Sequence, residues 1–163
     1  MNIFYLHKHQ EICARMHANK HVVKMILETA QLLCNAHHLY PLHNFVPKYK
    51  PTHLKHPCTL WVVASIYHYE WLLKLGLELC KEYSFRYGKT HASQQVLMEL
   101  SVHKPKLPVK DFEDPPQAMP IEYKNRDCVT AYRLYYIKDK KHLLQYKKRS
   151  RPHFVVPVLS LVD

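Results

Sequence analysis

Polar side chains recur at intervals of three and four residues between positions 17 and 38, and several of them could do chemistry. They are His17, His21, Lys24, Glu28, Gln31, Asn35 and His38, which we call the polar stripe. Lys24 and Glu28 lie four residues apart, so they can pair and tune each other's pKa. A tuned lysine amine can attack an electrophile or hold a phosphate, and a glutamate can transfer protons or stabilise charge.

The residues between these positions are nearly all apolar, which is typical of a largely buried helix with one narrow polar stripe. The stripe then either faces solvent as a thin band or lines a cleft. Metal binding is a further alternative, because His17 and His21 are four residues apart and His53 and His56 could complete a site. The histidines match no specific metal-binding spacing, so we predict neither a metal nor a cofactor.

Two segments outside the stripe mix cations with aromatic rings. One is YSFRYGKTH at 83–91, where rings and cations can hold a phosphate and stack on a base, or simply end a helix. The other is 138–152, which contains seven Lys or Arg and a single Asp. This density of positive charge favours contact with a phosphate backbone. The candidate nucleic-acid-binding residues are Lys20, Lys50, His53, Lys55, His56, Arg86, Tyr87, Lys89, His91, Lys141, Lys147, Lys148, Arg149 and Arg151.

Composition supports a polyanionic partner and excludes several classes of protein. The chain has 163 residues, with 24 Lys and Arg against 13 Asp and Glu, a net charge of +11. Because the chain has only two glycines, it cannot contain a P-loop, a dinucleotide-binding GxGxxG motif or a GxSxG nucleophile elbow. No apolar run is long enough to span a membrane, no signal peptide is evident, and five cysteines without a CxxC pair suit an intracellular protein with reduced thiols.

The elements that must position these residues are predicted to be helical. Apolar spacing predicts helices at 10–18, 20–38, 57–84, 91–101 and 128–146, with Asn19 and Asp127 as N-caps, Pro57 as a first residue and Gly88 as a stop. Prolines make 39–55 and 104–120 loops. We therefore predict an all-α protein: one compact domain at 1–152, with three main helices, short helices and long Pro-containing loops, followed by an apolar tail at 153–163.

Several segments in this order resemble, remotely, the phage-type pyrimidine dimer DNA glycosylase family, and short phage and viral proteins are similar as well. The resemblance rests on CARMH at 13–17, HPCTLW at 56–61, YEWLLKLGLELCKEYSFRYGK at 69–89 and PPQAMPIEYK at 115–124, followed by a helix and a basic tail. It implies a helical domain that binds duplex DNA and extrudes a base, whose α-amino group attacks the sugar and whose glutamate assists.

The resemblance also implies which residues act. His17 matches a histidine of the family, Lys24 stands where its catalytic glutamate is expected, and Glu28 is the nearest acid, one turn later. Asn2 is a poor substrate for removal of the initiator residue, so the free amine is expected on Met1. The candidate catalytic residues are Met1, Asn2, His17, His21, Lys24 and Glu28.

These observations together favour an intracellular DNA glycosylase with AP-lyase activity, acting on double-stranded DNA through a Schiff base on Met1 or Lys24. The alternatives are a non-enzymatic DNA-packaging or architectural protein and a histidine-ligated metalloprotein. Oligomeric state stays open.

Overall fold

The structure is a computed structural model that describes residues 1–155, and it confirms the all-α class. No β-strand occurs in that range, where one isolated bridge joins Leu42 and Phe45. The α-helices are α1 (Gln10–Met16), α2 (Asn19–Leu39), α3 (Pro57–Ala64), α4 (Ile66–Tyr87), α5 (Gln94–Val102) and α6 (Cys128–Asp139), with short 3-10 turns η1 (Ile121–Tyr123) and η2 (Lys141–Leu143).

Three predicted helix ends are confirmed by their local geometry. Pro57 is the first residue of α3, and the His56 side chain in front of it accepts from the Cys58 N–H. Gly88 ends α4 with φ 63°, a left-handed conformation that favours glycine. The Asp127 carboxylate accepts from the Thr130 N–H at 2.8 Å and so caps α6.

The prediction of one long helix at 57–84 is wrong, because the helix is interrupted at Ser65. Ser65 is extended, with φ −155° and ψ 143°, and separates α3 from α4. Its buried hydroxyl accepts from the Tyr67 N–H and donates to the Lys110 carbonyl at 2.6 Å. Apolar spacing continues through this break, so the pattern alone could not reveal it.

Two other predicted boundaries also change. The last helix ends at Asp139 rather than near 146, and η2 follows it. Asn19 is the first residue of α2 rather than its cap, since Ala18 takes the cap position and donates its N–H to the Tyr136 hydroxyl. The Asn19 side chain accepts instead from Arg86 and from the Lys147 N–H.

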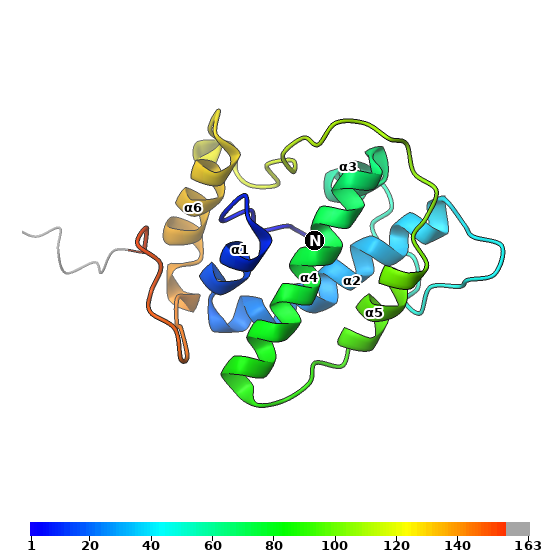
Figure 1. The fold of residues 1–163 in the computed structure, drawn as a ribbon. Helices are drawn as coiled ribbons and strands as arrows, with labels where there is room; N and C mark the ends of the chain where they lie inside the picture. Colours follow the sequence, from blue (N-terminus) through cyan, green and yellow to red (C-terminus); the bar gives the residue numbers. More distant parts are fainter. Residues whose placement is uncertain (156–163) are drawn as a thin grey trace, which may run out of the picture.

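The centre of the fold is the contact between α2 and α4, which Figure 1 shows crossing near the middle of the view, with α1 and α6 to the left and α5 to the right. Gly76 on α4 allows a close approach: a Cβ there would lie 2.9 Å from the Thr29 methyl on α2 and 3.1 Å from Leu97 on α5. The first residues, Ile3 to Leu6, are buried within the same core. This packing holds the start of the chain against α2.

The polar stripe divides into an exposed part and a buried part. Lys24 is exposed and Glu28 is half-buried, whereas Asn35 is fully buried and donates to the Thr52 carbonyl. His38 contacts the Tyr49 carbonyl through Nε2 at 2.8 Å, so the far end of the stripe anchors the loop at 39–55.

Within residues 1–155, no helix is both long enough and apolar enough to cross a lipid bilayer. All five cysteines are buried and free. Of the predicted apolar tail, Phe154 packs on the core under the Arg133 guanidinium, 4.9 Å from the ring centroid, and Val155 is buried. The remainder of that tail, residues 156–163, lies outside the described residues.

Candidate active site

One pocket lies where the start of the chain meets α2 and α6. It has a volume of about 350 Å³. Three segments far apart in the sequence form it, and its lining is Met1, Asn2, Phe4, Lys20, His21, Lys24, Met25, Glu28, Tyr135, Lys140 and Leu143. Five of the six candidate catalytic residues therefore meet here, together with one candidate DNA-binding lysine.

Glu28 connects α2 to the start of the chain. Its Oε2 accepts from the backbone nitrogen of Asn2 at 3.2 Å, and its Oε1 lies 3.5 Å from Nζ of Lys24. The Glu28 side chain is 13% exposed and that of Lys24 is 67% exposed, so the carboxylate lies at the base of the pocket and the ammonium at its mouth. A carboxylate in this position can stabilise a cation or accept a proton near the chain terminus.

The Asn2 side chain fixes the start of the chain in place. Nδ2 donates to the Ala118 carbonyl at 2.9 Å, and Oδ1 accepts from the Tyr132 hydroxyl at 2.9 Å. Tyr132 is fully buried on α6. The segment around 118 and the helix α6 thus hold Asn2 beside Glu28.

His21 presents one nitrogen to the pocket and the other to the core. The Tyr136 hydroxyl accepts from the Ala18 N–H, so its own proton is free for Nδ1 of His21, 2.7 Å away. This arrangement leaves the ring proton on Nε2, which has no protein partner in the described part of the chain and keeps some exposed surface. Burial, aided by His17, Lys140 and Lys24, lowers the pKa of His21 to about 3, so its ring is neutral.

The opposite wall of the pocket comes from α6 and η2, which sequence reasoning assigned to the core and to a basic segment. The Tyr135 ring lies 6.2 Å from that of Phe4, and Nζ of Lys140 lies 5.0 Å from the Tyr135 ring centroid. Tyrosines at helical spacing carry no sign of which ones face a pocket, so the sequence could not single out Tyr135.

His17 and Arg86 do not line this pocket. His17 is fully buried, with Nδ1 against the Cys13 carbonyl at 2.7 Å, and burial lowers its pKa to about 4. Arg86 has no exposed surface and donates to Glu82 at 2.8 Å and to the His17 carbonyl at 2.8 Å. The predicted phosphate contact by Arg86 is therefore wrong, because its guanidinium is used inside the fold.

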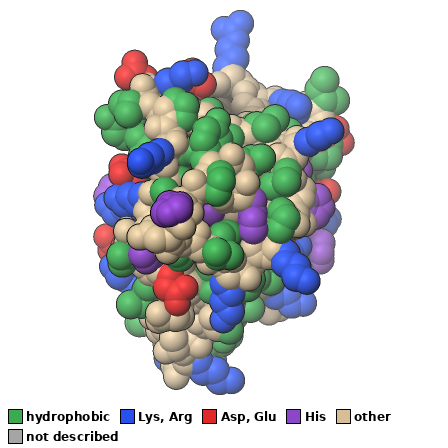
Figure 2. All heavy atoms as spheres, turned by 90° about the vertical axis from the view of Figure 1, so that its right-hand side faces the viewer, with side chains coloured by type: hydrophobic (Ala, Val, Ile, Leu, Met, Phe, Trp, Pro, Cys, Tyr) green, Lys and Arg blue, Asp and Glu red, His purple; other side chains and the backbone are tan. Residues whose placement is uncertain are grey.

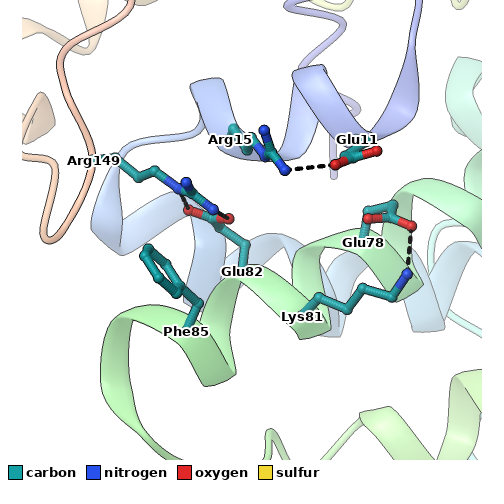
Figure 3. A pocket seen from close by; sticks show the side chains of 7 residues that line it. All are labelled: Glu11, Arg15, Glu78, Lys81, Glu82, Phe85 and Arg149. Carbon is teal, nitrogen blue, oxygen red and sulfur yellow. Dashed lines mark hydrogen bonds and ion pairs between the residues drawn. The ribbon is translucent and has the colours of Figure 1, made fainter.

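The Arg149 side chain also binds another residue of the fold. A second pocket, of about 240 Å³, lies between α1, α4 and the segment after α6. Figure 3 shows Arg149 reaching across it to Glu82, above Phe85. Arg149 donates two hydrogen bonds to this carboxylate, at 2.8 and 3.0 Å. Burial would raise the pKa of Glu82, but hydrogen bonds from Arg149 and Arg86 outweigh it and lower the pKa.

The other candidate DNA-binding residues are dispersed over several segments. Lys147 lies 5.4 Å from the Tyr87 ring centroid near the start of α2, and His91 contacts the Val23 carbonyl at 3.1 Å. Figure 2 shows Lys, Arg and His spread among hydrophobic side chains over one face rather than gathered into one patch. The candidates with exposed side chains are Lys20, Lys50, His53, Lys55, Lys89, Lys141, Lys147, Lys148 and Arg151.

His56 is half-buried and close to the start of the chain. Burial lowers the pKa of His56, and the charge of the N-terminal ammonium lowers it further while Glu28 opposes the effect. Across residues 1–155, no three His, Cys, Asp or Glu side chains converge in a way that could hold a metal ion.

Comparison with known proteins gives one result. A family model described as pyrimidine dimer DNA glycosylase matches residues 1–95, which span α1 to the start of α5 and include every α2 residue of the pocket. Neither a curated protein nor a solved structure matches the chain.

Proposed function

The chain belongs to the pyrimidine dimer DNA glycosylase family, and we propose that it removes a base from duplex DNA and then cleaves the strand at the resulting abasic site. The observation that carries this proposal is the contact of 3.2 Å between Glu28 and the start of the chain, inside a pocket rimmed by lysines. At the level of the family, the protein is a DNA-repair glycosylase. The strand cleavage, the duplex form of the DNA and the roles below are the proposal.

The reaction needs an extruded nucleotide, because the sugar carbon is inaccessible within a stacked duplex. The α-amine of Met1 attacks C1′ of the deoxyribose, and the base departs with the bonding electrons and takes up a proton. The attached nitrogen loses a proton, its lone pair then breaks the C1′–O4′ bond, and O4′ takes up a proton, which gives a protonated imine on the opened sugar. Removal of a C2′ proton then expels the 3′ phosphate and breaks the strand.

Each pocket residue has a role in this proposal. Glu28 stabilises the positive charge that develops on the sugar and handles the protons, since its carboxylate lies at the base of the pocket. His21 offers its Nε2–H as a neutral donor to an oxygen of the sugar. Lys20, Lys24 and Lys140 hold the flanking phosphates.

Borohydride trapping on a duplex with one abasic site tests the proposal. Reduction fixes the imine as a covalent protein–DNA adduct, and we expect one with the wild-type protein. Glu28→Gln is expected to lower the rate of adduct formation by about 100-fold or more. Glu78→Gln is the matched control, because Glu78 is also 13% exposed and also pairs with a lysine, Lys81, on the same helical face.

The Lys24→Ala variant and an N-terminally acetylated protein separate the two candidate amines. We expect the adduct to persist in Lys24→Ala and to disappear on acetylation. Salt-dependent binding without any adduct would contradict the proposal and support a non-enzymatic DNA-binding protein, for which the charge of +11 would be sufficient.

A further inference from the structure

Two large apolar side chains on α2 face solvent beside the pocket. Val23 is 38% exposed and Leu27 is 39% exposed, and they lie four residues apart on one strip of the helix. Each directly precedes a pocket residue, Lys24 or Glu28, so this strip runs alongside the pocket wall. The remainder of α2 buries its other valine, its isoleucine and its other leucines, apart from Leu39 at the C-terminal end.

Two lysines lie beside this apolar pair. Lys20 and Lys24, both exposed, border it on the pocket side. His91 contacts the Val23 carbonyl, and burial lowers the pKa of His91, so its ring adds little positive charge here. The Lys147 N–H donates to the Asn19 side chain at the start of α2. Glu28 is the one acidic residue on α2, and its carboxylate points to the chain terminus. This charge suits a polyanion and disfavours a second copy of this basic chain.

We propose that Val23 and Leu27 form a wedge that enters the base stack of duplex DNA at the gap left by the extruded nucleotide. The inference rests on the proposed function, because it needs a nucleotide held in the adjacent pocket. Extrusion leaves the neighbouring bases unstacked on one side, and an apolar side chain covers them better than a lysine does. The lysines around the wedge stay on the phosphates, and the duplex kinks where the wedge inserts.

A fluorescence assay tests the wedge without any bond cleavage. The probe is a duplex with a tetrahydrofuran abasic analogue and 2-aminopurine as the neighbouring base, whose fluorescence rises when it unstacks. We expect the wild-type protein to raise the signal and Val23→Ala/Leu27→Ala to reduce that rise by about tenfold, because the unstacked base then has no apolar side chain to cover it. Binding to an undamaged duplex should change by less than about twofold.

Ile12→Ala is the matched control, because Ile12 on α1 is also 39% exposed but does not line the pocket. We expect it to behave as wild type in both assays. The wedge is contradicted if the double variant matches Ile12→Ala, or if it loses binding to undamaged duplex equally. Since borohydride trapping reports the chemistry separately, a failed wedge and a failed glycosylase are distinguishable.

Discussion

At the residue scale, the start of the chain is held by groups from three other segments, two of which are more than 100 positions away. Asn2 uses its backbone nitrogen for Glu28 and its side chain for Ala118 and Tyr132. These contacts remove the conformational freedom that a chain terminus ordinarily has. A nucleophile on this terminus would therefore be positioned before the substrate binds, and its ordering would not cost entropy in each reaction.

Tyr132→Phe tests this anchoring. The Tyr132 hydroxyl shares its one proton between Asn2 Oδ1 and the Pro116 carbonyl and accepts from the Ala118 N–H, so its loss leaves these polar groups without a partner. We expect a loss of roughly 1–3 kcal/mol in the free energy of unfolding. We also expect slower borohydride adduct formation under conditions where the variant is fully folded. An unchanged rate would show that Tyr132 serves the fold alone.

Buried histidines predict how stability depends on pH. Burial lowers the pKa of His17 to about 4, of His37 to about 4 and of His21 to about 3, against an ordinary 6.5. Below pH 6.5 the unfolded chain binds protons that the folded chain excludes. The contribution of these neutral histidines to the free energy of unfolding is therefore fully present above about pH 6.5. It falls as pH drops towards 4, by about 1.4 kcal/mol per histidine per pH unit.

Urea unfolding at pH 7, 6 and 5 measures this dependence. The free energy of unfolding should decrease at each step, and replacement of the exposed His43 by Gln should leave that decrease unchanged. A free energy that stays constant between pH 7 and 5 would contradict neutral buried histidines. The sequence could count these histidines, but which of them are buried depends on the three-dimensional fold.

At the element scale, α2 combines the pocket wall with the main helix contact of the fold. Its identity as a helix followed from apolar spacing, and the pairing of Lys24 with Glu28 followed from their separation of four residues. The sequence could not show that Val23 and Leu27 face solvent, because valine and leucine at these positions are equally suited to a core. It also could not place Tyr135 and Lys140 opposite, since that requires the packing of α6.

Gly76→Ala tests how closely the helices must approach. The added methyl would meet the stiff Thr29 side chain, one residue after Glu28, and push α2 away from α4. We expect a net loss of roughly 1–2 kcal/mol in the free energy of unfolding, since overpacking outweighs the better helix propensity of alanine. Borohydride adduct formation should fall too, because Glu28 moves with α2.

Gly88→Ala is the control for this variant. Gly88 has φ 63° and no atom within 4 Å of an added Cβ, so alanine there meets backbone strain without a clash. We expect some loss of stability but no change in adduct formation by the folded protein. If Gly76→Ala is as stable and as active as wild type, the close approach does not position the site.

At the scale of the whole molecule, charge alone predicted a polyanionic partner but not which cations are free to bind it. Arg86 and Arg149 were both candidates, and both bind Glu82 instead. Glu82 lies four residues before Arg86 on α4, but its burial and its pairing with the distant Arg149 are visible only after folding. The family assignment and the all-α class, in contrast, could be inferred from sequence motifs and apolar spacing.

The salt dependence of DNA binding separates free cations from engaged ones. Affinity for duplex should fall steeply with salt, and Lys147→Ala should lower the slope of log K against log salt by about 1. Arg149→Ala should leave the slope unchanged and instead lower the free energy of unfolding by roughly 1–2 kcal/mol, because Glu82 loses two hydrogen bonds. An equal fall in slope for both variants would contradict the assignment of Arg149 to the fold.

The location of the trapped adduct tests the central claim most directly. After borohydride reduction on abasic duplex, tryptic digestion and mass spectrometry identify the peptide that carries the deoxyribose remnant. We predict that it is the peptide of residues 1–8, modified on the α-amine. A remnant on Lys24, or a digest without any modified peptide, would contradict a catalytic centre built from the start of the chain and Glu28.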